Sequence, residues 1–154
     1  MRFEDIVRVP VSQIPSREPV QVPPSARLGE VVTMMRERRT GAALVVDRGE
    51  LIGIFTERDL MRRCDHSSHA WRDRPVAEVM TARPLVIREE DTVAEALRRI
   101  DVGKRRHLPI MRGREVIAII SVRDLLAYIA SRFPADFLNL PPSPEREARQ
   151  PWGG

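Results

Sequence analysis

The sequence has 154 residues, of which 42% are apolar and 31% charged, proportions typical of a soluble globular protein. No apolar run approaches the ~20 residues of a membrane-spanning helix, and residues 1–10 lack the apolar core of a signal peptide. We therefore expect a cytoplasmic protein without a membrane partner. The net charge of +4 comes from scattered arginines interleaved with acids, which argues against a nucleic-acid partner.

The first half of the chain predicts an arm followed by one α/β unit. Residues 1–18 contain two prolines and no helical period, so we expect an extended N-terminal arm with at most a short strand or turn. The unit, residues 19–64, starts with a short strand, after which Ser25 is the predicted N-cap of a helix. Apolar residues at i, i+3, i+4 and i+7 from Leu28 indicate that helix. Two strands joined by a tight turn and a second helix follow.

The same pattern returns 65 residues further along the chain without a gap. The apolar helix face and the strand residues recur position for position, which assigns a second unit to residues 80–130. Residues 65–79 are the predicted linker, and the proline-rich residues 131–154 are expected to form a flexible tail. Two units of this size are each near the lower limit for independent folding, so we expect them to share one core.

Each unit carries a hydroxyl, an arginine and a carboxylate where its last strand meets its last helix. The first N–H groups of a helix have no partner within the helix, so an anion is favoured there. In one interpretation the hydroxyl is an N-cap and the aspartate completes a capping box. In the other the group binds a ligand, and its recurrence in both units favours that interpretation. The residues are Thr56, Arg58 and Asp59 in the first unit and Ser121, Arg123 and Asp124 in the second.

The two junctions read GIFTERDL and AIISVRDL, and three further motifs are PVAEVMT at 75–81, TVAEALRRI at 92–100 and KRRHLPI at 104–110. Together these motifs resemble those of CBS domains, small modules named after cystathionine β-synthase, and KRRHLPI is similar to an element of stand-alone bacterial CBS-pair proteins. The resemblance covers roughly residues 15–130. It implies a mixed α/β (α+β) fold, a tandem pair of β-α-β-β-α units packed sheet to sheet with pseudo-twofold symmetry, and association into a homodimer.

The resemblance also implies a function. Many members of the family bind adenosine-containing ligands in two clefts between the repeats, which implies a regulatory sensor of AMP, ADP, ATP, NAD or S-adenosylmethionine. Such a sensor is not an enzyme, requires no cofactor, and acts on a partner protein or on dimer geometry. Asp59 and Asp124 would accept hydrogen bonds from the ribose hydroxyls, and the hydroxyls of Thr56 and Ser121 would form hydrogen bonds with the phosphate or the ribose. The further candidates are Ile54 and Ile119 against adenine, and Arg58, Arg123, Arg105, Arg106 and His107 for phosphate.

The two clefts are expected to be unequal. Ala118 stands where the first unit has Gly53, which would crowd the second cleft. Arg106 and His107 replace two small residues of the first unit. We expect one tight site and one weak or empty site, with the anionic ligand held better beside Asp124.

Two other functions remain open from the sequence. His66 and His69 are three residues apart and, with Asp65 or Cys64, offer a metal site. Nucleic-acid binding through the arginines is the second alternative, and salt dependence would reveal it. The matched duplication favours ligand binding over catalysis, because a catalytic set is not expected to recur in both units.

Overall fold

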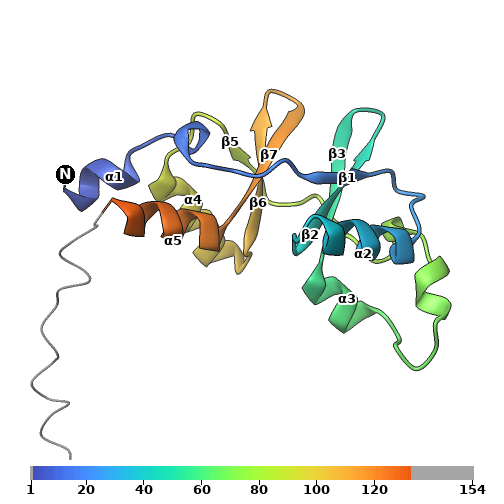
Figure 1. The fold of residues 1–154 in the computed structure, drawn as a ribbon. Coiled ribbons are helices and arrows are strands. Elements are labelled where there is room, and N and C mark those ends of the chain that lie inside the picture. The colour runs from blue at the N-terminus through green and yellow to red at the C-terminus, as the bar shows by residue number, and fades with distance from the viewer. Residues whose placement is uncertain (1, 133–154) are drawn as a thin grey trace, which may run out of the picture.

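The structure, a computed structural model, describes residues 2–132, so residues 133–154 of the predicted tail lie outside it. Figure 1 shows the two repeats side by side, and the mixed α+β prediction is confirmed. No helix among the described residues is long and apolar enough to cross a bilayer. The first repeat contains β1 (Val20–Val22), α2 (Leu28–Glu37), β2 (Ala42–Asp47), β3 (Glu50–Thr56) and α3 (Glu57–Arg63). The second contains β5 (Ile87–Arg88), α4 (Val93–Gly103), β6 (His107–Arg112), β7 (Glu115–Ser121) and α5 (Val122–Ser131).

Both repeats have the same sheet topology. The first strand runs parallel to the second, which forms an antiparallel hairpin with the third. Each hairpin has one irregularity in its register, between Val45 and Val46 in the first repeat and between Ile110 and Met111 in the second. Because a bulge bends its strand and these positions correspond in the repeat, both hairpins bend at the same place. The repeat seen in the sequence therefore extends to backbone detail.

The first helix of the first repeat starts later than predicted. Its N-cap residue is Arg27, so the prediction that Ser25 caps this helix is wrong. Arg27 forms an antiparallel bridge with Pro75, and the N–H of Leu28 donates to the carbonyl of Arg74 at 2.9 Å. The linker backbone thus holds the chain extended and satisfies one of the helix N–H groups that have no partner within the helix.

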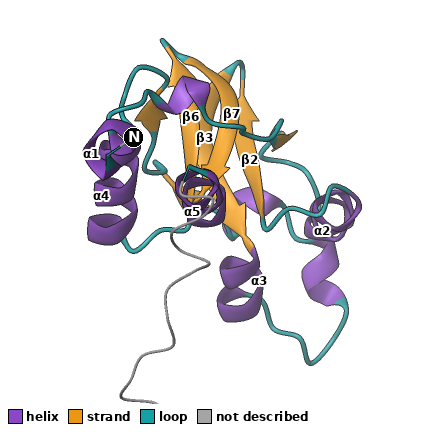
Figure 2. Cartoon of the chain, turned by 60° about the vertical axis from the view of Figure 1, so that its left-hand side comes forward, coloured by secondary structure: helices purple, strands orange, loops and turns teal. Residues whose placement is uncertain are grey.

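The two sheets pack face to face. A cluster of buried apolar side chains from both hairpins lies between them, and each repeat has a further core between its sheet and its helices. Figure 2 shows β2, β3, β6 and β7 together at the centre with the helices outside. The predicted sheet-to-sheet arrangement is confirmed. The buried residues between the sheets are Ala42, Leu44, Ile54, Val116 and Ile119.

The N-terminal residues belong to the core of the second repeat. They form a helix, α1 (Phe3–Val7), and a 3-10 turn, Val11–Gln13, so the prediction of an extended arm is wrong there. Ile6, Val11 and Ile14 are buried against the second repeat, and Figure 1 shows α1 beside α4. These three residues are spaced to contact the second repeat and do not line one face of a helix. The sequence of the arm therefore shows no helical periodicity.

The two repeats exchange edge segments. The residues that lead into the first strand of one repeat pair with the sheet of the other repeat. Arg17, ahead of the first repeat, pairs antiparallel with Ile119 of β7. Strand β4 (Thr81–Ala82), ahead of the second repeat's β5, pairs with β3. The linker before β4 contains two 3-10 turns, Ala70–Asp73 and Val76–Glu78. The crossings bring residues of both edge segments to the boundary between the repeats.

Candidate functional site

Two clefts open where the repeats meet. Cleft 1, with a volume of about 630 Å³, is lined by Ser121, Arg123 and Asp124. Cleft 2, about 590 Å³, is lined by the equivalent residues of the first repeat, Thr56, Arg58 and Asp59. The predicted apolar residues follow the same division, with Ile119 in cleft 1 and Ile54 in cleft 2. Both volumes lie in the range of small-molecule sites.

Both aspartates take part in capping boxes. The N–H of Thr56 donates to Asp59 Oδ2 at 2.9 Å, and the N–H of Asp59 donates to Thr56 Oγ1 at 3.4 Å. The equivalent distances for Ser121 and Asp124 are 2.8 and 3.2 Å. The capping interpretation is thus confirmed in both repeats. Each hydroxyl also donates its proton to the same Oδ2, so a phosphate oxygen would compete with the protein for it.

The second oxygen of each carboxylate distinguishes the clefts. Asp59 is only 7% exposed, and its Oδ1 accepts from the Thr81 hydroxyl at 3.4 Å and lies 3.6 Å from Arg63 Nε. Asp124 is more exposed, and among residues 2–132 no hydrogen bond or ion pair reaches its Oδ1. Because a carboxylate oxygen accepts about two hydrogen bonds, Asp124 retains one oxygen for a ligand.

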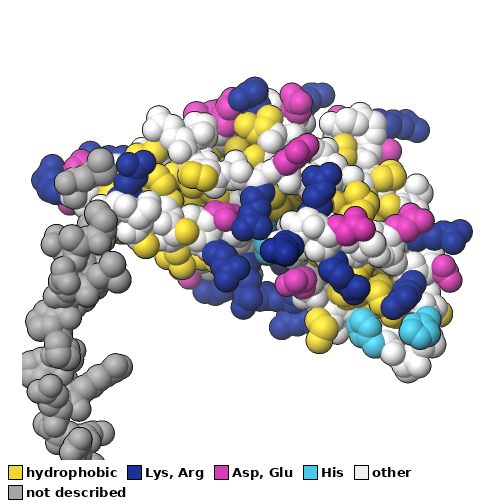
Figure 3. Space-filling model, viewed as in Figure 1, with side chains coloured by type: hydrophobic (Ala, Val, Ile, Leu, Met, Phe, Trp, Pro, Cys, Tyr) yellow, Lys and Arg dark blue, Asp and Glu magenta, His cyan; other side chains and the backbone are white. Residues whose placement is uncertain are grey.

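Cleft 1 is strongly basic. Five arginines and two carboxylates line it, and within the described part of the chain none of these arginines pairs with a carboxylate. Figure 3 shows Lys and Arg side chains gathered where the repeats meet. Sequence reasoning missed three of the arginines because the N-terminal arm and α2 reach the cleft only through tertiary packing. The arginines are Arg17, Arg36, Arg39, Arg106 and Arg123.

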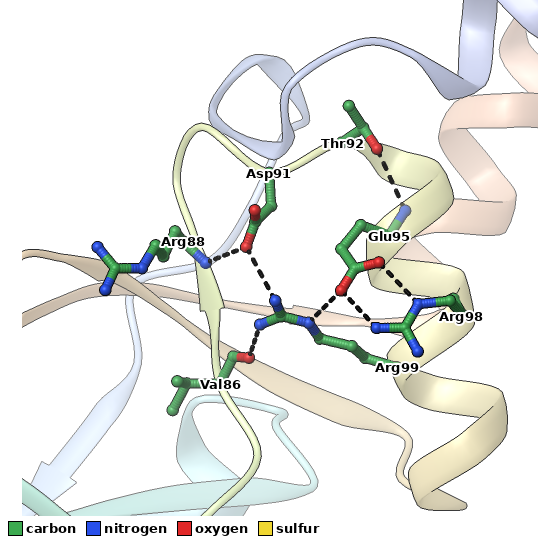
Figure 4. A network of polar contacts seen from close by, with 7 residues as sticks. All are labelled: Val86, Arg88, Asp91, Thr92, Glu95, Arg98 and Arg99. Atoms are coloured by element: carbon green, nitrogen blue, oxygen red, sulfur yellow. Dashed lines mark hydrogen bonds and ion pairs between the residues drawn. The ribbon is translucent and has the colours of Figure 1, made fainter.

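Two cations of cleft 2 are already paired with carboxylates of the protein: Lys104 Nζ lies 3.2 Å from Asp101 Oδ1, and Arg99 is held by a larger network. Arg99 Nε lies 2.6 Å from Glu95 Oε1, its Nη1 donates to the carbonyl of Val86 at 2.6 Å, and its Nη2 lies 3.5 Å from Asp91 Oδ2 (Figure 4). Hydrogen bonds from Arg98 and Arg99 lower the pKa of Glu95 to about 2. Arg99 therefore holds the segment before β5 against α4 and offers little charge to a ligand.

Four residues line both clefts and form what we call the partition: Gly41, Glu57, Arg106 and His107. The sequence placed Arg106 and His107 beside Asp124 alone, whereas the structure places them against both clefts. Burial lowers the pKa of His107; Asp124 and Glu57 oppose this shift and Arg106 reinforces it. The imidazole is accordingly neutral at pH 7.

Ala118 does not crowd a cleft, contrary to the prediction. It belongs to the core of the second repeat and lines neither cleft. A Cβ on the equivalent Gly53 would overlap the sulfur of Met80, because the segment leading into β4 crosses over that glycine. The glycine is needed for the exchanged edge segment and not for a ligand.

His66, one of the two linker histidines that were candidates for a metal site, has structural contacts. His66 Nε2 lies 2.8 Å from the carbonyl oxygen of Leu60, and its ring packs edge-on against Trp71. Within residues 2–132 no group of three or more His, Cys, Asp or Glu side chains is placed to hold a metal ion. The geometry therefore gives no support to the metal alternative.

Protonation of His107 is expected to destabilise the fold. Its pKa is lowered in the folded protein, so the unfolded chain binds more protons, and the stability present above about pH 6.5 decreases as the pH falls below that value. Urea unfolding between pH 7.5 and 5 should show a smaller loss of stability for His107→Gln than for the wild type. Equal slopes for the two proteins would contradict this assignment.

The structure thus defines a class: a tandem α+β repeat protein whose halves exchange edge segments and enclose two basic clefts. The family model of the CBS domain matches residues 11–66 and again residues 76–131. The chain belongs to the CBS domain family and contains two CBS domains in tandem.

Relatives and solved structures agree with this assignment. CBS domain-containing protein CBSCBSPB1 of Arabidopsis thaliana is 34% identical over 106 residues, 68% of this chain, which spans about a fifth (20%) of that relative's length. A conserved protein from Pyrococcus horikoshii has a similar structure, with a TM-score of 0.72 and 26% identity over 82% of this chain and 94% of its own. A CBS domain protein from Pyrobaculum aerophilum, solved in complex with AMP, has a TM-score of 0.68 and 24% identity over 80% of this chain and 99% of its own.

Proposed function

We propose that this protein is a regulatory module that binds an adenosine-containing ligand, and that cleft 1 is the tighter site. The observation that carries this proposal is the free Oδ1 of Asp124 in a cleft lined by five arginines. An ionised carboxylate is a strong acceptor for the two neighbouring hydroxyls of a ribose. The AMP in the Pyrobaculum aerophilum relative supports a ligand of this class.

Cleft 1 offers a suitable surface for each part of such a ligand. Val32, Met35, Leu60 and Ile119 give it apolar surface on which an adenine ring can pack. The arginines supply donors for phosphate, and a guanidinium group binds phosphate oxygens with two parallel hydrogen bonds. The ribose would lie between these two regions, at Asp124.

Cleft 2 is proposed as the weaker site. The Oδ1 of Asp59 is already engaged by Thr81 and Arg63, so ribose hydroxyls would have to displace protein donors there. Arg99 is held by carboxylates. The proposed difference in affinity favours the same cleft as the sequence analysis did. The physical reason is different, because it lies in the edge segment that brings Thr81 to Asp59.

The proposed output is a change in a homodimer or in a bound protein partner. Met61 on α3 and Leu126 on α5 are 75% and 56% exposed and occupy equivalent positions in the two repeats. Large apolar side chains on matching helices are compatible with a symmetric interface between two copies. A ligand would act on this assembly by binding its two states with different affinities. Analytical ultracentrifugation with and without AMP measures the effect.

Arg39 is expected to contribute charge to cleft 1 at a cost in backbone strain. Its φ of 51° is left-handed, a conformation that costs a residue with a side chain about 1 kcal/mol and glycine almost nothing. Arg39→Gly should therefore leave stability unchanged or slightly higher while weakening AMP binding about fivefold. The matched control is Arg48→Gly, with a φ of 49° in the β2–β3 turn. Equal AMP affinities for both variants would exclude the role of Arg39.

The proposed function is tested by a thermal-shift screen of AMP, ADP, ATP, NAD and S-adenosylmethionine, followed by titration calorimetry. At least one compound should raise the melting temperature, because a ligand that binds only the folded state stabilises it by mass action. Ribose 5-phosphate serves as the control without adenine and should bind more weakly. If none of the five compounds raises the melting temperature or gives a binding isotherm, the proposal fails.

A further inference from the structure

Glu57 belongs to the partition and lines both clefts, but the proposed ribose contacts do not involve its carboxylate. Its backbone is held in place by a hydrogen bond. Its N–H donates to the carbonyl of Gly41 at 3.0 Å. At the equivalent place in the second repeat, the N–H of Val122 donates to the carbonyl of Arg106 at 2.9 Å. The two helices therefore start at matching points, but only the first repeat adds a carboxylate there.

The side chain of Glu57 lies over Gly41. A Cβ built on Gly41 would be 3.2 Å from Glu57 Oε2 and 3.5 Å from His107 Cε1, so the glycine provides the space that both side chains share. Unlike Asp59 and Asp124, Glu57 is outside the capping boxes, and within residues 2–132 its carboxylate has no hydrogen bond and no ion pair. An unpaired negative charge thus faces both clefts.

We propose that Glu57 is a specificity-determining residue that limits the negative charge of the ligands both clefts accept. This inference rests on the proposed function and concerns the same clefts. The attraction of the arginines and the repulsion from Glu57 both increase with each further phosphate charge, so Glu57 offsets part of the affinity that the arginines would give to a triphosphate. Compared with the same clefts without this carboxylate, Glu57 therefore shifts the preference from a nucleoside triphosphate toward a monophosphate. Because Glu57 lines both clefts, the same limit applies to a ligand in either of them.

Glu57→Gln tests this proposal because it removes the charge and keeps the shape of the side chain. Titration calorimetry of this variant should show AMP bound about fivefold more tightly than by the wild type, ATP about twentyfold more tightly, and adenosine unchanged within about twofold. The matched control is Glu50→Gln, which removes the same charge at the far end of β3, where Glu50 lies 4.0 Å from Arg114. The control should leave all three affinities unchanged.

Three results would overturn the role of Glu57. AMP and ATP could tighten by the same factor, adenosine could respond as strongly as AMP, or the Glu50→Gln control could respond as strongly as Glu57→Gln. Each would mean that the residue does not select ligands by their charge.

A second titration separates this inference from the proposed function. If no adenosine-containing compound binds the wild type, the proposed function is refuted, and inorganic phosphate and pyrophosphate then serve as the probes. Glu57→Gln should improve pyrophosphate binding more than phosphate binding, because pyrophosphate brings more charge to the partition. Equal improvement, or no binding of either anion by either protein, would overturn the inference.

Discussion

Asp124→Asn is expected to weaken AMP binding about thirtyfold. The substitution keeps an oxygen that can accept from the Ser121 N–H, so the helix cap is retained, but it removes the charge that strengthens the hydrogen bonds from ribose. A hydrogen bond to a charged group contributes about 2 kcal/mol, which corresponds to a factor of about thirty in affinity. Titration calorimetry at constant pH and salt measures the change.

Asp59→Asn is the matched variant in the other repeat. Because Asp59 Oδ1 is engaged by Thr81 and Arg63, this substitution should lower AMP affinity less than about threefold. It is expected to lower protein stability more than Asp124→Asn does, since Asp59 is the more buried carboxylate. Equal losses of AMP affinity from the two substitutions would refute the unequal clefts.

Ile6→Ala is expected to lower the free energy of unfolding by about 3 kcal/mol. Ile6 is fully buried, and it packs with Val11 and Ile14 in the core of the second repeat. Truncating a buried isoleucine to alanine removes apolar contacts and leaves a cavity, with a typical cost of about 2–5 kcal/mol. A peripheral extended arm would not have this effect, so the variant tests whether the N-terminal residues belong to the fold. Urea unfolding monitored by circular dichroism measures it.

Glu4→Ala in the same helix is the control for Ile6→Ala. Glu4 is exposed, and substitutions at such sites usually change stability by less than about 0.5 kcal/mol. If the two substitutions cost the same, α1 contributes nothing to the core of the second repeat. A large loss from Ile6→Ala alone supports the arrangement in Figure 1.

The repeat, the order of its elements and the fold class could be predicted from the sequence. Local signals carry these features: helical spacing from Leu28, a hairpin turn between two apolar runs, and a hydroxyl three residues before an aspartate. The spacing of hydroxyl and aspartate also predicted the two capping boxes, and the structure contains both of them, at Thr56 and at Ser121.

The features that were missed depend on contacts between distant parts of the chain. Arg17 enters cleft 1 only because its segment pairs with Ile119, and Thr81 reaches Asp59 only because β4 crosses to the first sheet. No local pattern encodes either crossing. The arginine-rich run at 36–39 was a signal that could have been used, since it precedes Gly41 as Lys104 and Arg105 precede Arg106.

A crystal structure of the protein soaked with AMP tests the central claim most directly. The account predicts a nucleotide in cleft 1, with both ribose hydroxyls donating to Asp124 Oδ1 and the phosphate among the arginines of that cleft. An empty cleft 1, or AMP bound with Asp124 contacting only Ser121 and its own helix, would contradict it.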